Sequence, residues 1–254
     1  MSSAKVIKEN LINPAVAIYF KIFPLKIMRY HMYRVDKFMR GVAEKYNVRG
    51  KKILDIGAQK SPYKKYFDKV DYYSQDIVQN SEQSVDFVGD INEGLIAIKD
   101  SSFDYIICTQ VLEHIKQPKK AFEEFHRILK PGGRLFLTAP LCFEEHMIPY
   151  DYFRFTRYGL KYMGESTGFD TEYISPQGGI FQIIALIFDT LLIKLFFKKG
   201  FFYYLYAVIF TIPIFVFNSV CYLLDFLDRD KIMTLNYECV YVNRHSRSVK
   251  KVLD

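Results

Sequence analysis

The stretch ILDIGAQKSPY (53–63) decides how the rest of the chain is interpreted. Three of its first four residues, Ile53, Leu54 and Ile56, are apolar, which is typical of a buried strand. Gly57 lets the backbone turn tightly after that run. Ser61 and Pro62 then favour the start of a helix, because serine caps helices and proline suits the first helical position. A strand, a glycine turn and a helix start together are typical of a loop that binds a nucleotide-like ligand.

Downstream of this stretch, short apolar runs alternate with helical stretches, which predicts βαβ units and a mainly parallel sheet. The expected helices cover residues 118–129 and 156–166, and residues 11–46 are expected to be helical before the first strand. The expected strands are seven: 52–56, 72–74, 85–88, 103–108, 134–138, 169–175 and 237–243. We therefore expect an α/β fold with a seven-stranded sheet and helices on both of its faces.

The chain is long enough for one α/β domain, and its N-terminal segment is unusually basic. A chain of 254 residues can build one such domain plus an elaboration. Its four cysteines form no C-x-x-C pair, so we expect neither a zinc site nor a disulfide framework, but a reduced, cytoplasmic setting without a secretory signal. Residues 1–52 carry twelve Lys or Arg and three acids, a net charge of +9, which leaves −2 for the remainder. This placement suits a phosphate-bearing partner or an anionic membrane surface.

Three acidic residues lie at the ends of successive expected strands, where an open parallel sheet binds its ligands. Asp55 belongs to the first strand, Asp76 to the second and Asp90 to the third. Asp76 follows Asp55 at about the spacing expected of an acid that binds ribose hydroxyls. Three carboxylates suit a neutral or cationic nucleoside and would repel a pyrophosphate. The pattern therefore favours S-adenosylmethionine, which carries a sulfonium and no phosphate, over a dinucleotide.

Five stretches together resemble the class I S-adenosylmethionine-dependent methyltransferases, of the small-molecule type 11. In the family's order, within a continuous region of about 35–180, they are ILDIGA (53–58), QDI (75–77), GDI (89–91), FDYIICTQVLEHI (103–115) and RILKPGGRLFLTAP (127–140). The following EEHMIPYDYFRFTRYGL (144–160) resembles the version found among enzymes of cell-surface polysaccharide and glycolipid synthesis. The resemblance implies a Rossmann-like sheet and S-adenosylmethionine as the cofactor.

The resemblance also implies cofactor-binding roles position by position. Asp55 and Gly57 would shape the pocket for the methionine part, and Asp76 would bind the ribose. Asp90 and Ile91 would contact the adenine, and Thr109 and Gln110 would border the sulfonium. Ala58 and Ile77 are also expected to belong to the cofactor-binding residues. Gln59 stands where the family usually has glycine, and its side chain could crowd the amino-acid part of the cofactor. Because Ser61 and Pro62 follow at once, the loop can also take a different path around it.

Residues 144–160 supply the expected acceptor side of the site. Methyl transfer needs alignment above all, and a hydroxyl acceptor also benefits from a general base. His146 is the expected base, and Asp151 is close enough in sequence to orient it. Tyr150, Tyr152 and Arg154 would line the acceptor pocket, with Arg154 on a carboxylate or phosphate of the substrate. The alternative is that this loop is an aromatic lid over the cofactor.

Other chemistries leave weaker traces. His114 is a second candidate base, but in this pattern the Glu-His pair mostly packs the site. No cluster of acids marks a metal site. Enzymes that methylate nucleic-acid bases would be expected to carry an Asn/Asp-Pro-Pro-aromatic motif after the fourth strand. This sequence has Thr109, Gln110 and Val111 there. We therefore expect neither a metal nor a nucleic-acid partner.

The segment between the last two expected strands is anomalous. Residues 180–227 are strongly apolar, and FFYYLYAVIFTIPIFVFNSVCYLL (201–224) contains no charged residue. About 20 apolar residues suffice to span a membrane, but a single crossing is excluded because both ends must return to one sheet. A double crossing would place Lys198 and Lys199 on the far side, against the usual bias of basic residues. We expect a monotopic helical hairpin, with a buried subdomain or a homodimer interface as the alternative.

These observations predict three parts. They are a basic, aromatic-rich helical segment (1–48), a methyltransferase domain (49–179 and 234–245) and a hydrophobic helical insertion (180–233). The expected function is methyl transfer from S-adenosylmethionine to oxygen on a sugar or lipid-linked saccharide. The expected location is the cytoplasm, with peripheral or monotopic attachment to the inner face of the membrane. The alternative is a catalytically silent interaction module with the same fold, anchored at a membrane or in a dimer, which only Gln59 favours.

Overall fold

The computed structural model describes residues 27, 29–196 and 201–244, so the expectations for residues 1–26 lie outside its described part. The chain divides into two compact units. The first comprises residues 1–34, 142–149 and 176–235, and the second comprises 35–141, 150–175 and 236–254. The whole expected insertion (180–233) therefore falls within the first unit.

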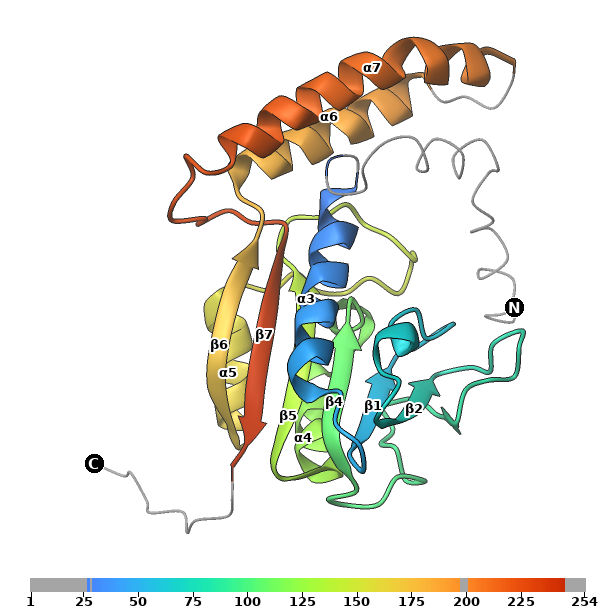
Figure 1. The fold of residues 1–254 in the computed structure, drawn as a ribbon, viewed down its shortest axis with the longest axis vertical. Helices are drawn as coiled ribbons and strands as arrows, with labels where there is room; N and C mark the ends of the chain where they lie inside the picture. The colour runs from blue at the N-terminus through green and yellow to red at the C-terminus, as the bar shows by residue number, and fades with distance from the viewer. Residues whose placement is uncertain (1–26, 28, 197–200, 245–254) are drawn as a thin grey trace. The chain divides into compact units, whose positions relative to one another are not determined.

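The second unit is built on a seven-stranded sheet with the strand order β3-β2-β1-β4-β5-β7-β6 (Figure 1). The strands are β1 (Lys52–Ile56), β2 (Asp71–Asp76), β3 (Phe87–Val88), β4 (Phe103–Thr109), β5 (Leu129–Pro140), β6 (Phe169–Gln177) and β7 (Asn236–Asn243). The β1–β2, β1–β4, β2–β3 and β4–β5 pairs are parallel, whereas β5 and β7 are antiparallel. The predicted mainly parallel sheet is confirmed.

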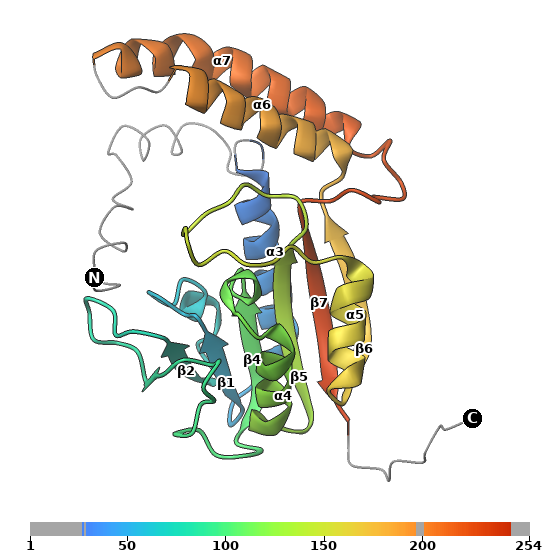
Figure 2. The same cartoon turned by 180° about the vertical axis from the view of Figure 1, so that it is seen from behind.

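Helices cover both faces of this sheet (Figures 1 and 2). Helix α3 (Tyr30–Tyr46) lies on one face, and α4 (Pro118–Ile128) and α5 (Arg157–Ser166) lie on the other. Successive strand side chains point to opposite faces. Within β1, Ile53 therefore belongs to the core cluster formed with α3, whereas Leu54 belongs to the cluster formed with α4.

The predicted helix at Ser61–Pro62 is wrong. Only a short 3-10 turn, η3 (Lys64–Tyr66), follows the glycine turn. Gln59 and Ser61 have φ angles of 49° and 50°, in the left-handed region that a right-handed helix does not use. The Ser61 amide donates to the Ala58 carbonyl at 2.6 Å, which closes a turn where the helix was expected to begin.

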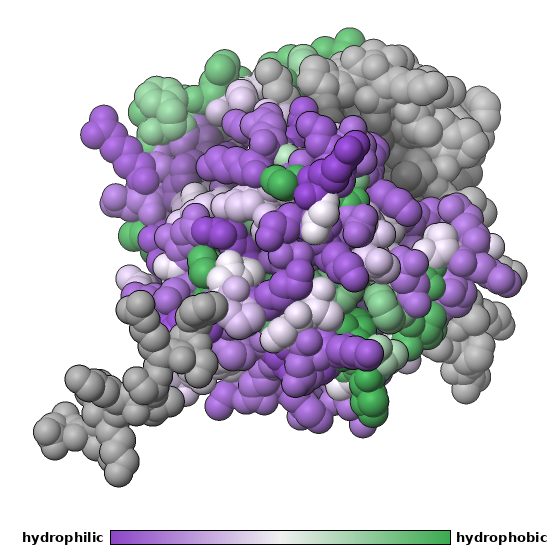
Figure 3. All heavy atoms as spheres, turned by 60° about the horizontal axis from the view of Figure 1, so that its bottom comes forward, coloured by the Kyte–Doolittle hydropathy of each residue, from purple (hydrophilic) through white to green (hydrophobic). Residues whose placement is uncertain are grey.

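The edge of the sheet where the parallel strands begin is held by charged side chains. Asp104 accepts hydrogen bonds from the ammonium groups of Lys51 at 2.9 Å and Lys130 at 2.8 Å, and from the Lys52 amide at 3.0 Å. Figure 3, which turns the lower end of Figure 1 toward the reader, shows mainly hydrophilic side chains there. This edge therefore stabilises the fold, and the candidate site lies where the parallel strands end.

The first unit contains two helices that lie between β6 and β7 in the chain, α6 (Ile180–Phe196) and α7 (Phe201–Leu224). The rings of Phe188 and Phe217 pack with their centroids 4.3 Å apart, and the Asn218 side-chain amide donates to Asp189 at 2.9 Å. Lys198 and Lys199, between the helices, lie outside the described residues. Within the described part of the chain, no helix combines the length and the apolar character that a membrane crossing needs.

Candidate cofactor and acceptor site

The turn after β1 requires a glycine. Gly57 has a φ of 65°, which L side chains rarely adopt, and a Cβ atom there would lie 2.5 Å from Cγ2 of Val111. The Ala58 amide then donates to the carbonyl of Gln75 on β2 at 3.0 Å. The turn is therefore fixed between the ends of β2 and β4.

Gln59 and Asp76 meet at this turn. The Gln59 amide donates to Oδ2 of Asp76 at 2.8 Å, and the Ile77 amide donates to Oδ1 at 2.7 Å. The Gln59 carbonyl accepts a hydrogen bond of 2.6 Å from the Asn80 side chain. A carboxylate has about four acceptor positions, so Asp76 retains capacity for ribose hydroxyls while two backbone amides orient it. The Ile77 side chain is exposed.

The third acidic position lies next along the same sheet edge. The Gly89 amide donates to the Asp76 carbonyl at 3.0 Å, which joins the end of β3 to the end of β2. Oδ1 of Asp90 accepts from the backbone amide of Asn92 at 2.9 Å and from its side-chain amide at 2.8 Å. Ile91 is buried. The predicted ribose and adenine positions thus lie on neighbouring strand ends.

The end of β4 supplies the other border. Gln110 has a φ of 54°, its amide donates to the Thr138 carbonyl at 3.1 Å, and its side-chain amide donates to the Thr138 hydroxyl at 3.0 Å. The Thr109 side chain hydrogen-bonds with Tyr63, from the loop after β1. The Gln110 side chain is therefore held on β5, and Thr109 faces the loop that carries Gly57.

Asp55 is the most perturbed acid of the predicted cofactor set. Its side chain is only 2% exposed, and the Tyr72 hydroxyl donates to Oδ2 at 2.5 Å. Burial raises the pKa of Asp55 to about 7, Tyr72 opposes the rise, and the neighbouring Asp76 adds to it. Sequence reasoning missed Tyr72 and Tyr63. The signal for Tyr72 was incomplete, because strand alternation assigns it to one face of the sheet but the register that brings it to Asp55 is not encoded in a single strand.

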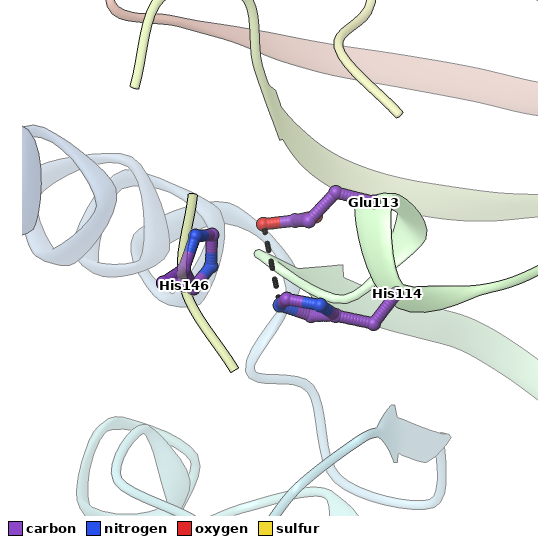
Figure 4. A group of neighbouring side chains, drawn as sticks. All are labelled: Glu113, His114 and His146. Carbon is purple, nitrogen blue, oxygen red and sulfur yellow. Dashed lines mark ion pairs between the residues drawn. The ribbon is translucent and has the colours of Figure 1, made fainter. Parts of the chain in front are cut away.

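A short 3-10 turn, η4 (Leu112–His114), follows β4 and carries a second buried acid. Glu113 is fully buried, and burial raises its pKa to about 8. His114 Nδ1–H donates to the Tyr150 carbonyl at 2.8 Å, and its Nε2 lies 3.9 Å from Oε1 of Glu113, the contact that the dashed line marks in Figure 4. The Tyr152 amide donates to the Glu113 carbonyl at 2.9 Å. Residues 150–152 are therefore anchored to the turn after β4.

The predicted acceptor residues of the second unit form a compact group. Arg154 donates to both oxygens of Asp151, at 2.6 and 2.7 Å, a bidentate geometry that fixes both side chains. The Asp151 side chain is almost fully buried, whereas those of Tyr150 and Tyr152 are exposed. Asp151 thus has a guanidinium partner that the sequence pattern did not predict.

His146 lies in the first unit, and its surroundings there are aromatic. Its Nδ1 lies 3.2 Å from the Glu144 carbonyl, and its ring packs against Phe143 with centroids 5.5 Å apart. Phe143 also packs against His31, with centroids 4.9 Å apart. Burial lowers the pKa of His31 to about 4, with Arg29 and His146 adding to the effect, so His31 is neutral at physiological pH.

Comparison with known proteins agrees with this geometry. Residues 54–137 match the family model described as a methyltransferase domain. Thiol S-methyltransferase TMT1B of Rattus norvegicus is 42% identical over 50 residues, which are 20% of either chain. Ubiquinone biosynthesis O-methyltransferase of Xanthomonas oryzae is 40% identical over 59 residues, which are 23% of this chain and 25% of that one. The chain thus matches a quarter or less of the length of these curated relatives.

Solved structures share the fold across most of the chain. Phosphoethanolamine N-methyltransferase 2 of Haemonchus contortus, in complex with S-adenosyl-L-methionine, aligns with a TM-score of 0.53 at 15% identity, over 96% of this chain and 60% of that chain. A Burkholderia thailandensis 1,6-didemethyltoxoflavin-N1-methyltransferase with bound S-adenosylhomocysteine aligns with a TM-score of 0.51 at 13% identity, over 91% and 89%.

The fold and the matched domain define the class. The strand order, the glycine turn after β1 and the acids at the ends of β1 and β2 agree with what the resemblance to the class I S-adenosylmethionine-dependent methyltransferases implies. The chain contains a methyltransferase domain of this family over residues 54–137. The residues present fit the cofactor. A buried carboxylate next to further acids is stabilised in its ionised form by a cation, and S-adenosylmethionine is cationic.

Proposed function

We propose that the chain transfers a methyl group from S-adenosylmethionine to an oxygen of a sugar or lipid-linked saccharide at a membrane surface. The observation that carries the transferase activity is the convergence of Asp55, Gly57 and Asp76 at one edge of the sheet, joined by the hydrogen bond from the Gln59 amide to Asp76. The cofactor, when bound, supplies an activated methyl group on its sulfonium.

In this proposal the chain's own residues bind the cofactor and orient it toward the acceptor. Asp76 holds the ribose hydroxyls through its remaining acceptor positions, and Asp90 and Ile91 lie at the adenine. Thr109 and Gln110 border the sulfur, held by their bonds to Tyr63 and Thr138 respectively. Alignment of acceptor and methyl group is the main contribution that the protein makes to such a displacement.

The proposed acceptor side rests on residues 144–160. The exposed rings of Tyr150 and Tyr152 suit the faces of a sugar, and the bidentate pair of Asp151 and Arg154 gives that segment a fixed geometry. His146, in the first unit, is kept as the predicted general base for an acceptor hydroxyl. The test is transfer of labelled methyl to a lipid-linked saccharide fraction, beside a thiol and a phenol. Transfer only to the thiol or the phenol would refute the saccharide assignment.

Cofactor binding is tested by calorimetric titration with S-adenosylmethionine and S-adenosylhomocysteine. Micromolar binding of both is expected in the wild-type protein. Asp76→Ala should weaken it about 30-fold or more, because two hydrogen bonds to a charged group are lost. Asp71→Ala is the matched control, since Asp71 is an exposed acid at the other end of β2. A folded wild-type protein that binds neither compound would refute the proposed function.

Membrane attachment is proposed from the exposed apolar residues of the first unit. On each of the two helices they recur at spacings of three or four, which places them on one face. Among the side chains that the structure describes, they are Ile180, Ile184, Ile187 and Leu191 on α6, and Ile212, Val216, Val220 and Leu223 on α7, while Leu224 at the end of α7 is also exposed. An apolar helix face of this kind suits the interfacial region of a bilayer.

Flotation with phosphatidylcholine vesicles containing phosphatidylglycerol tests this attachment. The wild-type protein should float, and the double variant Ile184→Asp, Ile187→Asp should stay at the bottom. Ile96→Asp is the control, because Ile96 is 92% exposed in a loop of the second unit. Wild-type protein that remains at the bottom and forms dimers would instead support a dimer interface.

A catalytically silent interaction module is the second candidate, and one observation favours it. Gln59 stands in a left-handed conformation where the family usually has glycine, and the loop after it forms a 3-10 turn in place of a helix. Gln59→Gly tests this candidate. If the Gln59 side chain closes the pocket, the variant should bind S-adenosylhomocysteine where the wild-type protein does not. Equal micromolar binding by both would exclude the silent module.

A further inference from the structure

Tyr72 of β2 is the side chain that orients the carboxyl group of Asp55 and favours its ionised form. In the register of β1 and β2, Ile53 is paired with Tyr72 and Asp55 with Ser74. Side chains two residues apart share a face, so Tyr72 and Asp55 lie on the same side of the sheet. The Tyr72 hydroxyl donates to Oδ2 of Asp55 at 2.5 Å, and Asp55 is almost fully buried. A hydroxyl-to-carboxylate bond of this length is strong, and it fixes the rotation of the carboxylate.

The described groups around Asp55 do not supply a positive charge that would stabilise its carboxylate. Among the described residues, the titratable groups near Asp55 on its own face of the sheet are Tyr72 and Asp76 from β2 and Tyr63 from the loop after β1, while Cys108 of β4 lies on the opposite face and interacts with Asp55 only electrostatically. Helix α3 contributes Asp36, which acts on Tyr63, and Lys64 Nζ lies 5.9 Å from the ring centroid of Tyr72. In the part of the chain that the structure describes, none of the groups that shift the pKa of Asp55 is a cationic side chain. Tyr72 is thus the neighbour that favours the ionised form of Asp55.

We infer that Tyr72 is a positioning residue of the cofactor site, which holds Asp55 as an oriented carboxylate for the ammonium group of the cofactor's amino-acid part. Tyr72 itself does not touch the cofactor. With Oδ2 bound by Tyr72, the carboxylate still has acceptor positions for an ammonium. This inference rests on the proposed function, because it requires that the cofactor bind at the end of β1.

The inference makes cofactor affinity dependent on pH. Binding of a cation needs ionised Asp55, so affinity should rise as the pH rises through about 7, and binding below that pH should release a proton. Tyr72→Phe removes the bond that favours ionisation. The midpoint of the affinity–pH curve should therefore move upward by about one pH unit, and the affinity at pH 7 should fall about tenfold.

Three ligands locate the group that Asp55 binds. S-adenosylmethionine and S-adenosylhomocysteine both carry the ammonium, only the first carries the sulfonium, and 5′-methylthioadenosine carries neither. Tyr72→Phe should weaken the first two equally and leave the third unchanged. Loss confined to S-adenosylmethionine would assign Asp55 to the sulfonium, and equal loss for all three would show a general disturbance of the pocket. Either result would overturn the inference.

The experiment is calorimetry between pH 5.5 and 8.5, in buffers of different ionisation enthalpy so that proton release is measured directly. Tyr73→Phe is the matched control, because Tyr73 is the next residue of β2 and packs on the opposite face. Thermal unfolding checks that each variant is folded. If the wild-type protein binds and Tyr72→Phe gives the same midpoint, this inference fails and the proposed function stands. If the wild-type protein binds none of the ligands, the proposed function itself fails.

Discussion

Replacing Asp55 by Asn should make the ligand-free protein more stable. The ordinary pKa of an aspartate is 3.8, and burial raises that of Asp55 to about 7. Between these values the folded protein binds a proton that the unfolded chain does not, so the free energy of unfolding falls as the pH rises from about 4 to about 7. At about 1.4 kcal/mol per pH unit, the accumulated penalty reaches roughly 4 kcal/mol above pH 7. Asn carries no charge, so the variant avoids that penalty.

The assay is chemical denaturation of the ligand-free wild-type protein and of Asp55→Asn between pH 4 and 8. Ionisable groups distant from Asp55 contribute equally to both proteins, so the difference between the two free energies reports Asp55 together with its coupling to neighbouring groups such as Asp76. That difference should be small at pH 4 and reach several kcal/mol in favour of the variant at pH 8. Asp71→Asn, at an exposed position of β2, should show no such divergence. Parallel curves for the wild-type protein and Asp55→Asn would refute the reasoning.

Two further substitutions test the rest of the fold. Gly57→Ala should lower the free energy of unfolding by about 2 kcal/mol or more, since the new Cβ would lie 2.5 Å from a Val111 methyl carbon at a φ of 65°; denaturant titration measures it, and an unchanged midpoint would contradict the geometry. Asp104→Asn should cost about 1–3 kcal/mol at pH 7, because it weakens the bonds to Lys51 and Lys130. The pKa of Asp104 is lowered, so this cost should vanish as the pH falls below about 4, and a pH-independent cost would exclude the ion pairs as its cause.

Strand positions were predictable because the buried strands of a parallel sheet are nearly continuous apolar runs. The first strand was predicted at 52–56 and β1 spans Lys52–Ile56. The acids Asp55 and Asp76 were predictable for a related reason: strand ends of a parallel sheet meet at one edge, so sequence order alone brings them together. Their detailed roles in binding remain predictions.

What the sequence could not predict depends on contacts between distant residues. Local preferences at Ser61 and Pro62 favour a helix, but the bonds of Gln59 to Asp76 and Asn80 hold the loop in left-handed conformations. Likewise, nothing within residues 53–63 indicates that a tyrosine hydroxyl of β2 will reach Asp55. Such side-chain pairs follow from register, which a single strand does not encode.

The position of the insertion in the sheet has a consequence for how such proteins diversify. β6 ends at Gln177 and β7 begins at Asn236, and these two strands are neighbours in the sheet. A short turn could connect them, and the entropic cost of a longer connection grows only slowly with its length. The segment between the strands can therefore be exchanged, shortened or replaced without altering the strand ends that carry Asp55 and Asp76. Such an exchange would change what this segment contacts while the candidate cofactor site stays as it is.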